Sequence, residues 1–162
     1  ATVFILINIL KPEIHDQTLM PALQSVWFVP HVSVYMFSYA LLGVATLLAI
    51  YYLVKRNESI LPAIDNLLGG GLALFTVGML TGALWAKQAW GEYWSWDAKE
   101  AWAAATWFLY LGAIHLRLMR PRGVQKFCIV LIVAFLSLQM CWYGVNYLPS
   151  AEKSVHSYNR NN

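Results

Sequence analysis

Charged side chains are scarce in this chain. Of its 162 residues, only 12% are Asp, Glu, Lys or Arg, whereas 59% are hydrophobic. Soluble domains carry about 25% charged residues, so the composition predicts a membrane protein, and the length predicts a single membrane domain over 1–162. The net charge of +3 is spread along the chain without a basic stripe, which argues against nucleic acid as a partner.

Cysteine is scarce as well, and a signal-peptide pattern is lacking. Cys128 and Cys141 lie in one apolar run at a spacing that fits neither a metal site nor a secreted disulfide framework. We therefore expect both to be ordinary apolar residues of a helix. The uncharged stretch 1–10 has no basic n-region. We expect it to end a longer hydrophobic segment, which makes the chain the C-terminal part of a longer protein.

Long uncharged runs are the most prominent feature that the sequence does contain. The runs 31–54, 67–86 and 127–148 contain no Asp, Glu, Lys or Arg over 24, 20 and 22 residues. A helix needs about 20 apolar residues to cross a bilayer. A fourth run, 101–116, is shorter, and its polar neighbours are expected to start the helix earlier. Because backbone groups in lipid must pair within the segment, the predicted fold is an all-α polytopic membrane protein, with four full transmembrane helices and part of a preceding one.

The basic residues predict an orientation. The connections 55–66 and 117–126 fall on one side of the membrane and hold six of the eleven basic residues. Cytoplasmic loops are enriched in Lys and Arg, so this side is predicted to face the cytoplasm. The expected membrane is the bacterial plasma membrane. The stretches 11–30, 87–100 and 149–162 then face outward.

Aromatic residues are concentrated in one outward stretch, WGEYWSWDAKEAW at 90–102, which holds four Trp and one Tyr. Asp97 and Glu100 match the pattern of a capping box at the start of the next helix. Gly91 permits an unusual turn, and Trp96 is expected to point elsewhere. If the stretch is helical, four side chains share one face, namely Trp90, Tyr93, Trp94 and Asp97.

Two interpretations of this stretch remain open. An aromatic belt at the membrane interface is the simpler one. The other is a platform for a large, flat, apolar ligand. Haem fits the second, because His31 and His156 lie on the same predicted side and could be axial ligands, while Lys87 and Lys99 could meet the propionates. A quinone would also suit the platform, although it needs no pair of histidines.

His115 stands apart from the outer histidines. It lies near the cytoplasmic end of its predicted span, about 25 Å from the start of that helix. It cannot share a ligand with His31 or His156 at that distance. An ionisable residue inside a span predicts a function, and contact with lipid headgroups is the alternative.

Four segments carry a resemblance to a known family. WAKQAWGEYWSWDAKEAWAAATW resembles the tryptophan-rich WWD motif of cytochrome c assembly proteins, with most similarity to the CcsA/ResC branch of the system II pathway. PALQSVWFVPHVSVYMFSYALL resembles the segment with the first external histidine. WFLYLGAIHLRL resembles the helix with a transmembrane histidine, and YGVNYLPSAEKSVHSY the segment with the second external histidine. The resemblance covers about 21–158.

The resemblance implies a protein that carries haem b from the cytoplasmic side to the outside. There it presents the haem to apocytochrome c, whose CxxCH thiols add to the vinyl groups. His31 and His156 would be the axial ligands of the external haem. His115 would ligate an inner haem whose second ligand lies outside this chain. The WWD surface holding the external haem would comprise Trp90, Gly91, Tyr93, Trp94, Trp96 and Asp97, with Tyr93 at the first of the paired aromatic positions.

The resemblance also implies partners and a reaction. A CcsB/ResB-like membrane protein would complete a holocytochrome c synthase within the lipid bilayer. No protein nucleophile is expected, because the acceptor's thiols attack and the protein's contribution is positioning. Two alternatives stay open. One is a haem-delivery subunit without synthase activity, similar to system I relatives, and the other is a quinone-binding membrane subunit.

Overall fold

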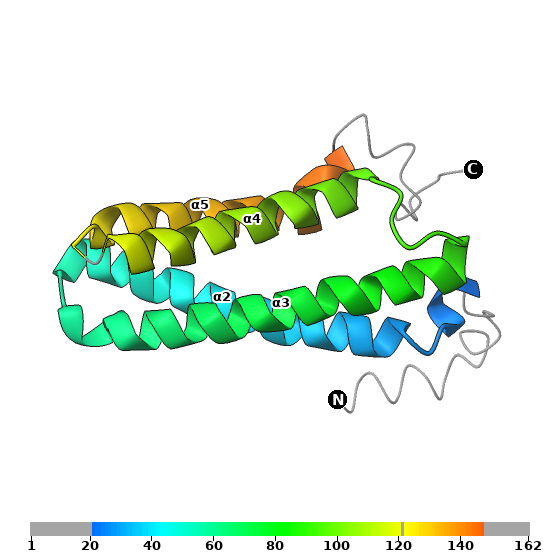
Figure 1. The fold of residues 1–162 in the computed structure, drawn as a ribbon, viewed down its shortest axis with the longest axis horizontal. Helices are drawn as coiled ribbons and strands as arrows, with labels where there is room; N and C mark the ends of the chain where they lie inside the picture. Colours follow the sequence, from blue (N-terminus) through cyan, green and yellow to red (C-terminus); the bar gives the residue numbers. More distant parts are fainter. Residues whose placement is uncertain (1–20, 121, 148–162) are drawn as a thin grey trace, which may run out of the picture.

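The computed structural model describes residues 21–120 and 122–147, and these form four long helices without a β-strand. The long helices are α2 (Phe28–Lys55), α3 (Leu61–Trp90), α4 (Ala98–Met119) and α5 (Val124–Trp142), shown in Figure 1. Short 3-10 helices flank them, namely η2 (Pro21–Gln24), η3 (Glu58–Ile60) and η4 (Gly144–Tyr147). The described part of the chain therefore confirms the all-α prediction.

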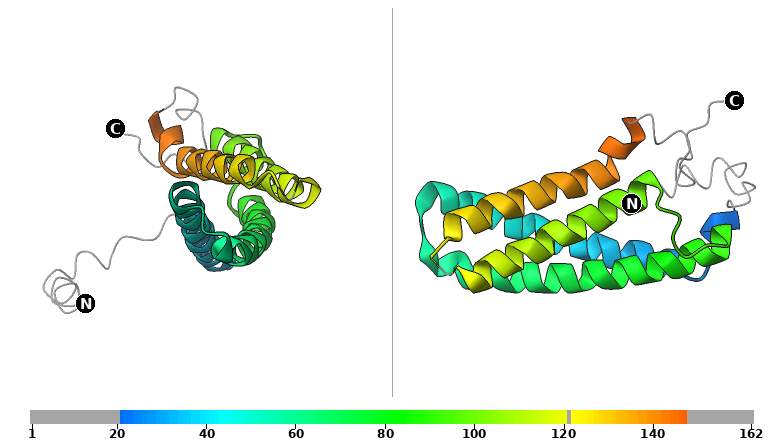
Figure 2. Two further views of the ribbon diagram at one scale, coloured as in Figure 1. Left: turned by 90° about the vertical axis from the view of Figure 1, so that its left-hand side faces the viewer. Right: turned by 45° about the horizontal axis from the view of Figure 1, so that its top comes forward.

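The bundle consists of two antiparallel helical hairpins. α2 packs along α3 and α4 packs along α5, while α5 also contacts α2 and α4 contacts α3 (Figures 1 and 2). We call the end with Trp85 and 90–97 the tryptophan end. The opposite end, with Arg56, Arg117 and Arg120, is the arginine end. The ribbons of α3 and α4 diverge toward the tryptophan end (Figure 1).

Among the described helices, three are long and apolar enough to cross a membrane, namely α2, α3 with η3, and α5. α4 has 22 residues, a length of about 33 Å, and charged residues near its ends lower its hydropathy. It begins at Ala98, before the run predicted at 101–116, as expected. α5 ends at Trp142, short of the predicted limit at 148, because the chain continues as η4. The predicted partial helix at 1–10 lies outside the described residues.

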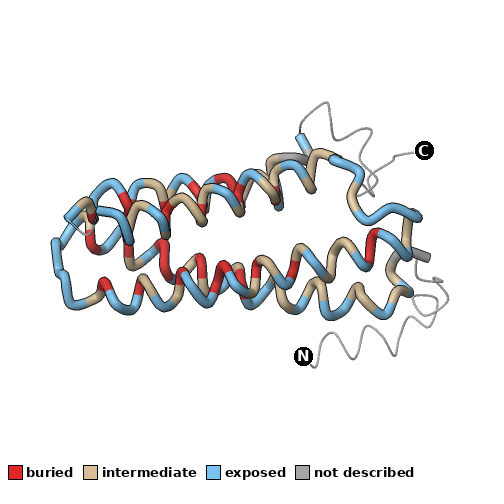
Figure 3. Tube along the Cα trace, in the orientation of Figure 1, coloured by how far each residue is buried: buried red, intermediate tan, exposed pale blue. Residues whose placement is uncertain are grey.

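Buried residues follow the inner faces of the helices (red in Figure 3). Small and hydroxyl-bearing residues occur where helices approach. The Ser38 hydroxyl donates to the Gly71 carbonyl at 2.8 Å, and the Thr106 and Ser137 hydroxyls lie 2.7 Å apart. Such residues at helix contacts are typical of membrane proteins, because close backbone approach and hydrogen bonds replace the hydrophobic driving force.

An ion pair connects the hairpins at the arginine end. Arg117 of α4 donates to Asp65 of α3, from Nε to Oδ1 at 3.0 Å and from Nη2 to Oδ2 at 3.1 Å. This forked geometry fixes both position and orientation of the pair. The two hairpins are thus held together at the arginine end.

Candidate functional site

The connection between α3 and α4, at 91–97, is not helical. Gly91 ends α3 with φ of 87°, a left-handed conformation that glycine adopts at little cost. Trp96 also has a positive φ, 58°, which costs about 1–3 kcal/mol in a residue with a bulky side chain. The condition for a shared helical face of Trp90, Tyr93, Trp94 and Asp97 is therefore not met, because the chain leaves the helix at Gly91.

A capping box fixes the end of the connection, as the sequence predicted. The Asp97 carboxylate accepts from the Glu100 backbone N–H at 2.8 Å. The Glu100 carboxylate accepts from the backbone N–H of Asp97 at 3.3 Å and from that of Ser95 at 2.8 Å. These bonds satisfy donors that the first turn of α4 would otherwise leave unpaired, and they tie Ser95 to the same helix.

Lys87 holds the beginning of the connection. Its ammonium donates to the Gly91 carbonyl at 2.7 Å and lies 5.2 Å from the centre of the Tyr93 ring. A cation at this distance over a ring is attracted to the π face. The predicted propionate candidate Lys87 therefore supports the connection itself, whereas Lys99, the other candidate, lines the cavity described next.

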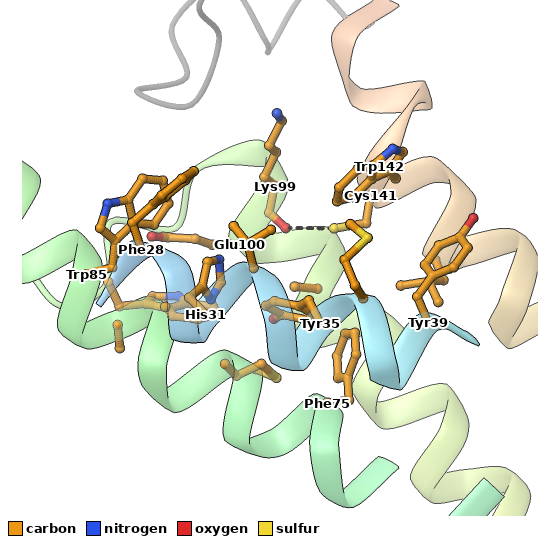
Figure 4. A pocket seen from close by; sticks show the side chains of 18 of the residues that line it. Phe28, His31, Tyr35, Tyr39, Phe75, Trp85, Lys99, Glu100, Cys141 and Trp142 are labelled. Carbon is orange, nitrogen blue, oxygen red and sulfur yellow. Dashed lines mark hydrogen bonds between the residues drawn. The ribbon is translucent and has the colours of Figure 1, made fainter. Parts of the chain in front are cut away.

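A cavity of about 500 Å³ lies between the two hairpins at the tryptophan end (Figure 4). Its volume falls within the range of about 300–1,000 Å³ typical of small-molecule sites. All four long helices and the connection contribute to its wall, which is mainly apolar and aromatic. The lining includes Phe28, His31, Tyr35, Trp85, Trp94 and Trp142.

His31 lies in this wall with its ring held by three neighbours. Its Nδ1 lies 2.9 Å from the Gly78 carbonyl oxygen. A carbonyl only accepts, so the Nδ1 of His31 is the donor in this contact. Trp85 stacks on the ring at 5.4 Å and 26°, and Tyr35 meets it edge-on at 4.8 Å and 89°. Metal-bound histidines are commonly oriented by such a bond from the second ring nitrogen.

The predicted WWD residues divide into two groups. Tyr93 and Trp94 line the cavity. Trp94 Nε1 is buried and has no hydrogen-bond partner among the described residues, so it is available to donate to a ligand. Trp90 packs against Trp85, with ring centres 4.8 Å apart, and Trp96 is 73% exposed with its ring edge-on to Trp94 at 5.7 Å. Trp90 and Trp96 are not among the residues that line the cavity, and neither are Gly91 and Asp97. These four residues shape the connection.

Several cavity residues were missed by the sequence analysis. Trp85 begins the segment, at about 85–102, that resembles the WWD motif, yet it was not assigned to the site, and Trp142 lies outside that segment. Cys141, expected to be an ordinary apolar residue of a helix, lines the cavity from α5, and its thiol donates to the Lys99 carbonyl at 3.5 Å. A signal for Trp85 was present, since the glycines at positions 78 and 82 precede it on one face of the same helix.

Of the other two predicted ligands, the structure describes only His115. His115 is on an exposed side of α4 and does not line the cavity, in agreement with its predicted separation from His31. His156 lies outside the described residues. Within the described part of the chain, no group of three or more His, Cys, Asp or Glu residues could hold a metal ion.

A family model described as "Cytochrome C assembly protein" matches residues 1–151. The chain belongs to the cytochrome c assembly protein family. Its long apolar helices and this membership make it an integral membrane protein. The resemblance that the WWD motif indicated is thereby confirmed.

Proteins named "Cytochrome c biogenesis protein CcsA" are similar to this chain over most of the chain's length. The protein of Chlamydomonas reinhardtii is 39% identical over 153 residues, which cover 86% of this chain and 42% of the relative. That of Guillardia theta is 36% identical over 172 residues, with 86% and 56% covered. That of Synechococcus sp. (strain CC9605) is 33% identical over 178 residues, with 86% and 58% covered. The chain spans about half the length of these relatives.

Membership of a cytochrome c assembly family implies haem handling, and the residues of the cavity fit haem. The aromatic wall suits a flat apolar ring. The Nδ1 of His31 is bonded to a backbone carbonyl, so an imidazole in this position would bind iron through Nε2. Trp94 Nε1 is a buried donor without a partner among the described residues, and a propionate would satisfy it.

Proposed function

We propose that this chain serves cytochrome c maturation by holding haem in the cavity at the tryptophan end and presenting it to apocytochrome c. The observation that carries the proposal is the setting of His31. Its Nδ1 is bonded to the Gly78 carbonyl while its ring forms part of an aromatic cavity of about 500 Å³. The names of the CcsA relatives support the same role.

The proposed orientation places the tryptophan end outside a bacterial plasma membrane and the arginine end in the cytoplasm. It is supported by the basic residues at the arginine end, including Arg56, Arg120 and Arg122. His115 would then contribute to an inner haem site. Because it is exposed on α4, a ligand from a CcsB/ResB-like partner could approach it. Haem would pass from that inner site to the outer cavity.

Haem is the substrate in this proposal, and its vinyl groups are the positions that react. Each CxxCH thiol adds across a vinyl C=C bond, with a new S–C bond at one carbon and a new C–H bond at the other. The chain's part is positioning. His31 and His156 would hold the iron, the aromatic wall the ring, and Trp94 Nε1 and Lys99 the propionates. The acceptor's histidine would then replace one protein ligand and release the product.

The test is a maturation assay with the full-length protein, its membrane partners and a co-expressed CxxCH reporter. We expect His31→Ala to lower both the haem content of the membrane protein and covalent attachment to the reporter. Added imidazole should restore them. Ser33→Ala, on the exposed side of the same helix, is the matched control and should leave both unchanged.

Other outcomes would select the alternatives. Haem that is bound through His31 but never attached to the reporter, even with the partners present, would favour a delivery subunit. Haem content and attachment that do not respond to His31→Ala would contradict the proposed site. A haem-free protein that retains a quinone in the cavity would favour the quinone-binding alternative.

A further inference from the structure

Helices α2 and α3 approach closely where His31 and Tyr35 face two glycines of α3. A Cβ added at Gly82 would lie 2.6 Å from His31 Cε1 and 2.8 Å from its Nδ1. A Cβ at Gly78 would lie 3.1 Å from Tyr35 Cδ2. Real Cβ atoms essentially never approach another heavy atom within 3.0 Å, so the imidazole could not keep its place beside any larger residue at position 82.

We infer that Gly82 is a positioning residue for His31. Residues 78, 82 and 85 are spaced i, i+4 and i+7, so they share one face of α3. On that face the Gly78 carbonyl bonds to Nδ1, the surface of Gly82 lies against the ring edge, and Trp85 stacks on the ring. These contacts fix the direction of Nε2. The inference rests on the proposed function, because it explains how the proposed iron ligand is aimed.

A general need for close helix packing is the competing explanation for this glycine. Gly71 separates the two, because a Cβ there would lie 2.7 Å from Leu42 Cδ2. It tightens the same helix pair without touching His31. Gly69, also in α3, has no atom of the described residues within 4 Å of an added Cβ. Gly69→Ala therefore reports only the higher helix propensity of alanine.

The experiment compares Gly82→Ala, Gly71→Ala and Gly69→Ala in the full-length protein purified with its membrane partners. Haem affinity, the absorption spectrum and thermal stability are measured for each. We expect Gly82→Ala to lower haem affinity by about 10-fold or more, the range seen when a group that orients a metal ligand is changed. Imidazole should restore the spectrum. Gly71→Ala should lower thermal stability with an unchanged spectrum of bound haem. Gly69→Ala should leave haem affinity and the spectrum unchanged and should not lower thermal stability.

A double substitution separates failure of this inference from failure of the proposed function. In the His31→Ala variant with added imidazole, the further substitution Gly82→Ala should lower haem affinity little, because a free imidazole is not tethered to α2. The inference is overturned if Gly82→Ala lowers haem affinity equally with and without the His31 side chain. It is also overturned if Gly82→Ala keeps wild-type haem affinity while His31→Ala loses haem. If His31→Ala itself retains haem with an unchanged spectrum, it is the proposed function that fails.

Discussion

Replacing Trp85 with leucine removes the ring that supports the His31 imidazole. The Trp85 side chain is 5% exposed, and its ring centre lies 5.4 Å from that of His31 and 5.5 Å from that of Phe28. A stacked pair contributes about 0.5–1.5 kcal/mol beyond the area it buries. If Trp85→Leu destabilises the ligand-ready orientation of His31 by this much, the equilibrium constant for that orientation falls about 2- to 13-fold. Haem affinity then falls by up to the same factor.

The assay is a titration of haem into haem-depleted full-length protein, followed by absorption. Trp107→Leu is the matched control. Trp107 is half-buried, its Nε1 donates to the Thr76 hydroxyl at 2.9 Å, and it is not among the residues that line the cavity. We expect weaker haem binding in Trp85→Leu and wild-type binding in Trp107→Leu. Equal affinity in wild type and Trp85→Leu, or an equal fall in both variants, would refute the reasoning.

Two further predictions concern the connection between α3 and α4. Asp97→Ala should lower stability by about 0.5–2 kcal/mol because it removes the N-cap; Asp97→Asn should retain most of it, and thermal unfolding that does not separate the two would contradict the capping role. Trp94→Phe keeps a ring and removes the buried Nε1–H, so it should weaken binding of haem more than binding of its dimethyl ester, which lacks carboxylates. A titration showing the same loss for both would exclude the propionate contact.

The helices were predictable from the sequence because uncharged runs in lipid have few other structures available. Their ends were less predictable. The start of α4 followed from the Asp97 and Glu100 pattern, which acts locally. The end of α5 did not, since the runs of apolar residues continue past Trp142 while the backbone changes to a 3-10 helix. The backbone of the connection was open from the sequence, because the aromatic spacing fits one face of a helix while Gly91 permits the left-handed turn that ends α3.

The candidate site was predictable only in part. His31 and the aromatic stretch stood out by residue type and by their common side of the membrane. The partner of His31 did not, because the Gly78 carbonyl lies 47 residues further along the chain and is a backbone group. Trp85 and Gly82 gain their roles from the packing of α2 on α3. Those contacts depend on the rotation of each helix, which uniformly apolar runs do not reveal.

The most direct test of the central claim is the absorption spectrum of the haem-loaded full-length protein with and without its two proposed ligands. His156 lies outside the described residues, so this measurement also tests the part of the site that the structure leaves to prediction. We expect a six-coordinate bis-histidine spectrum in the wild type, its loss in His31→Ala and in His156→Ala, and its recovery with imidazole. Wild-type haem content and spectrum in both variants would contradict the account.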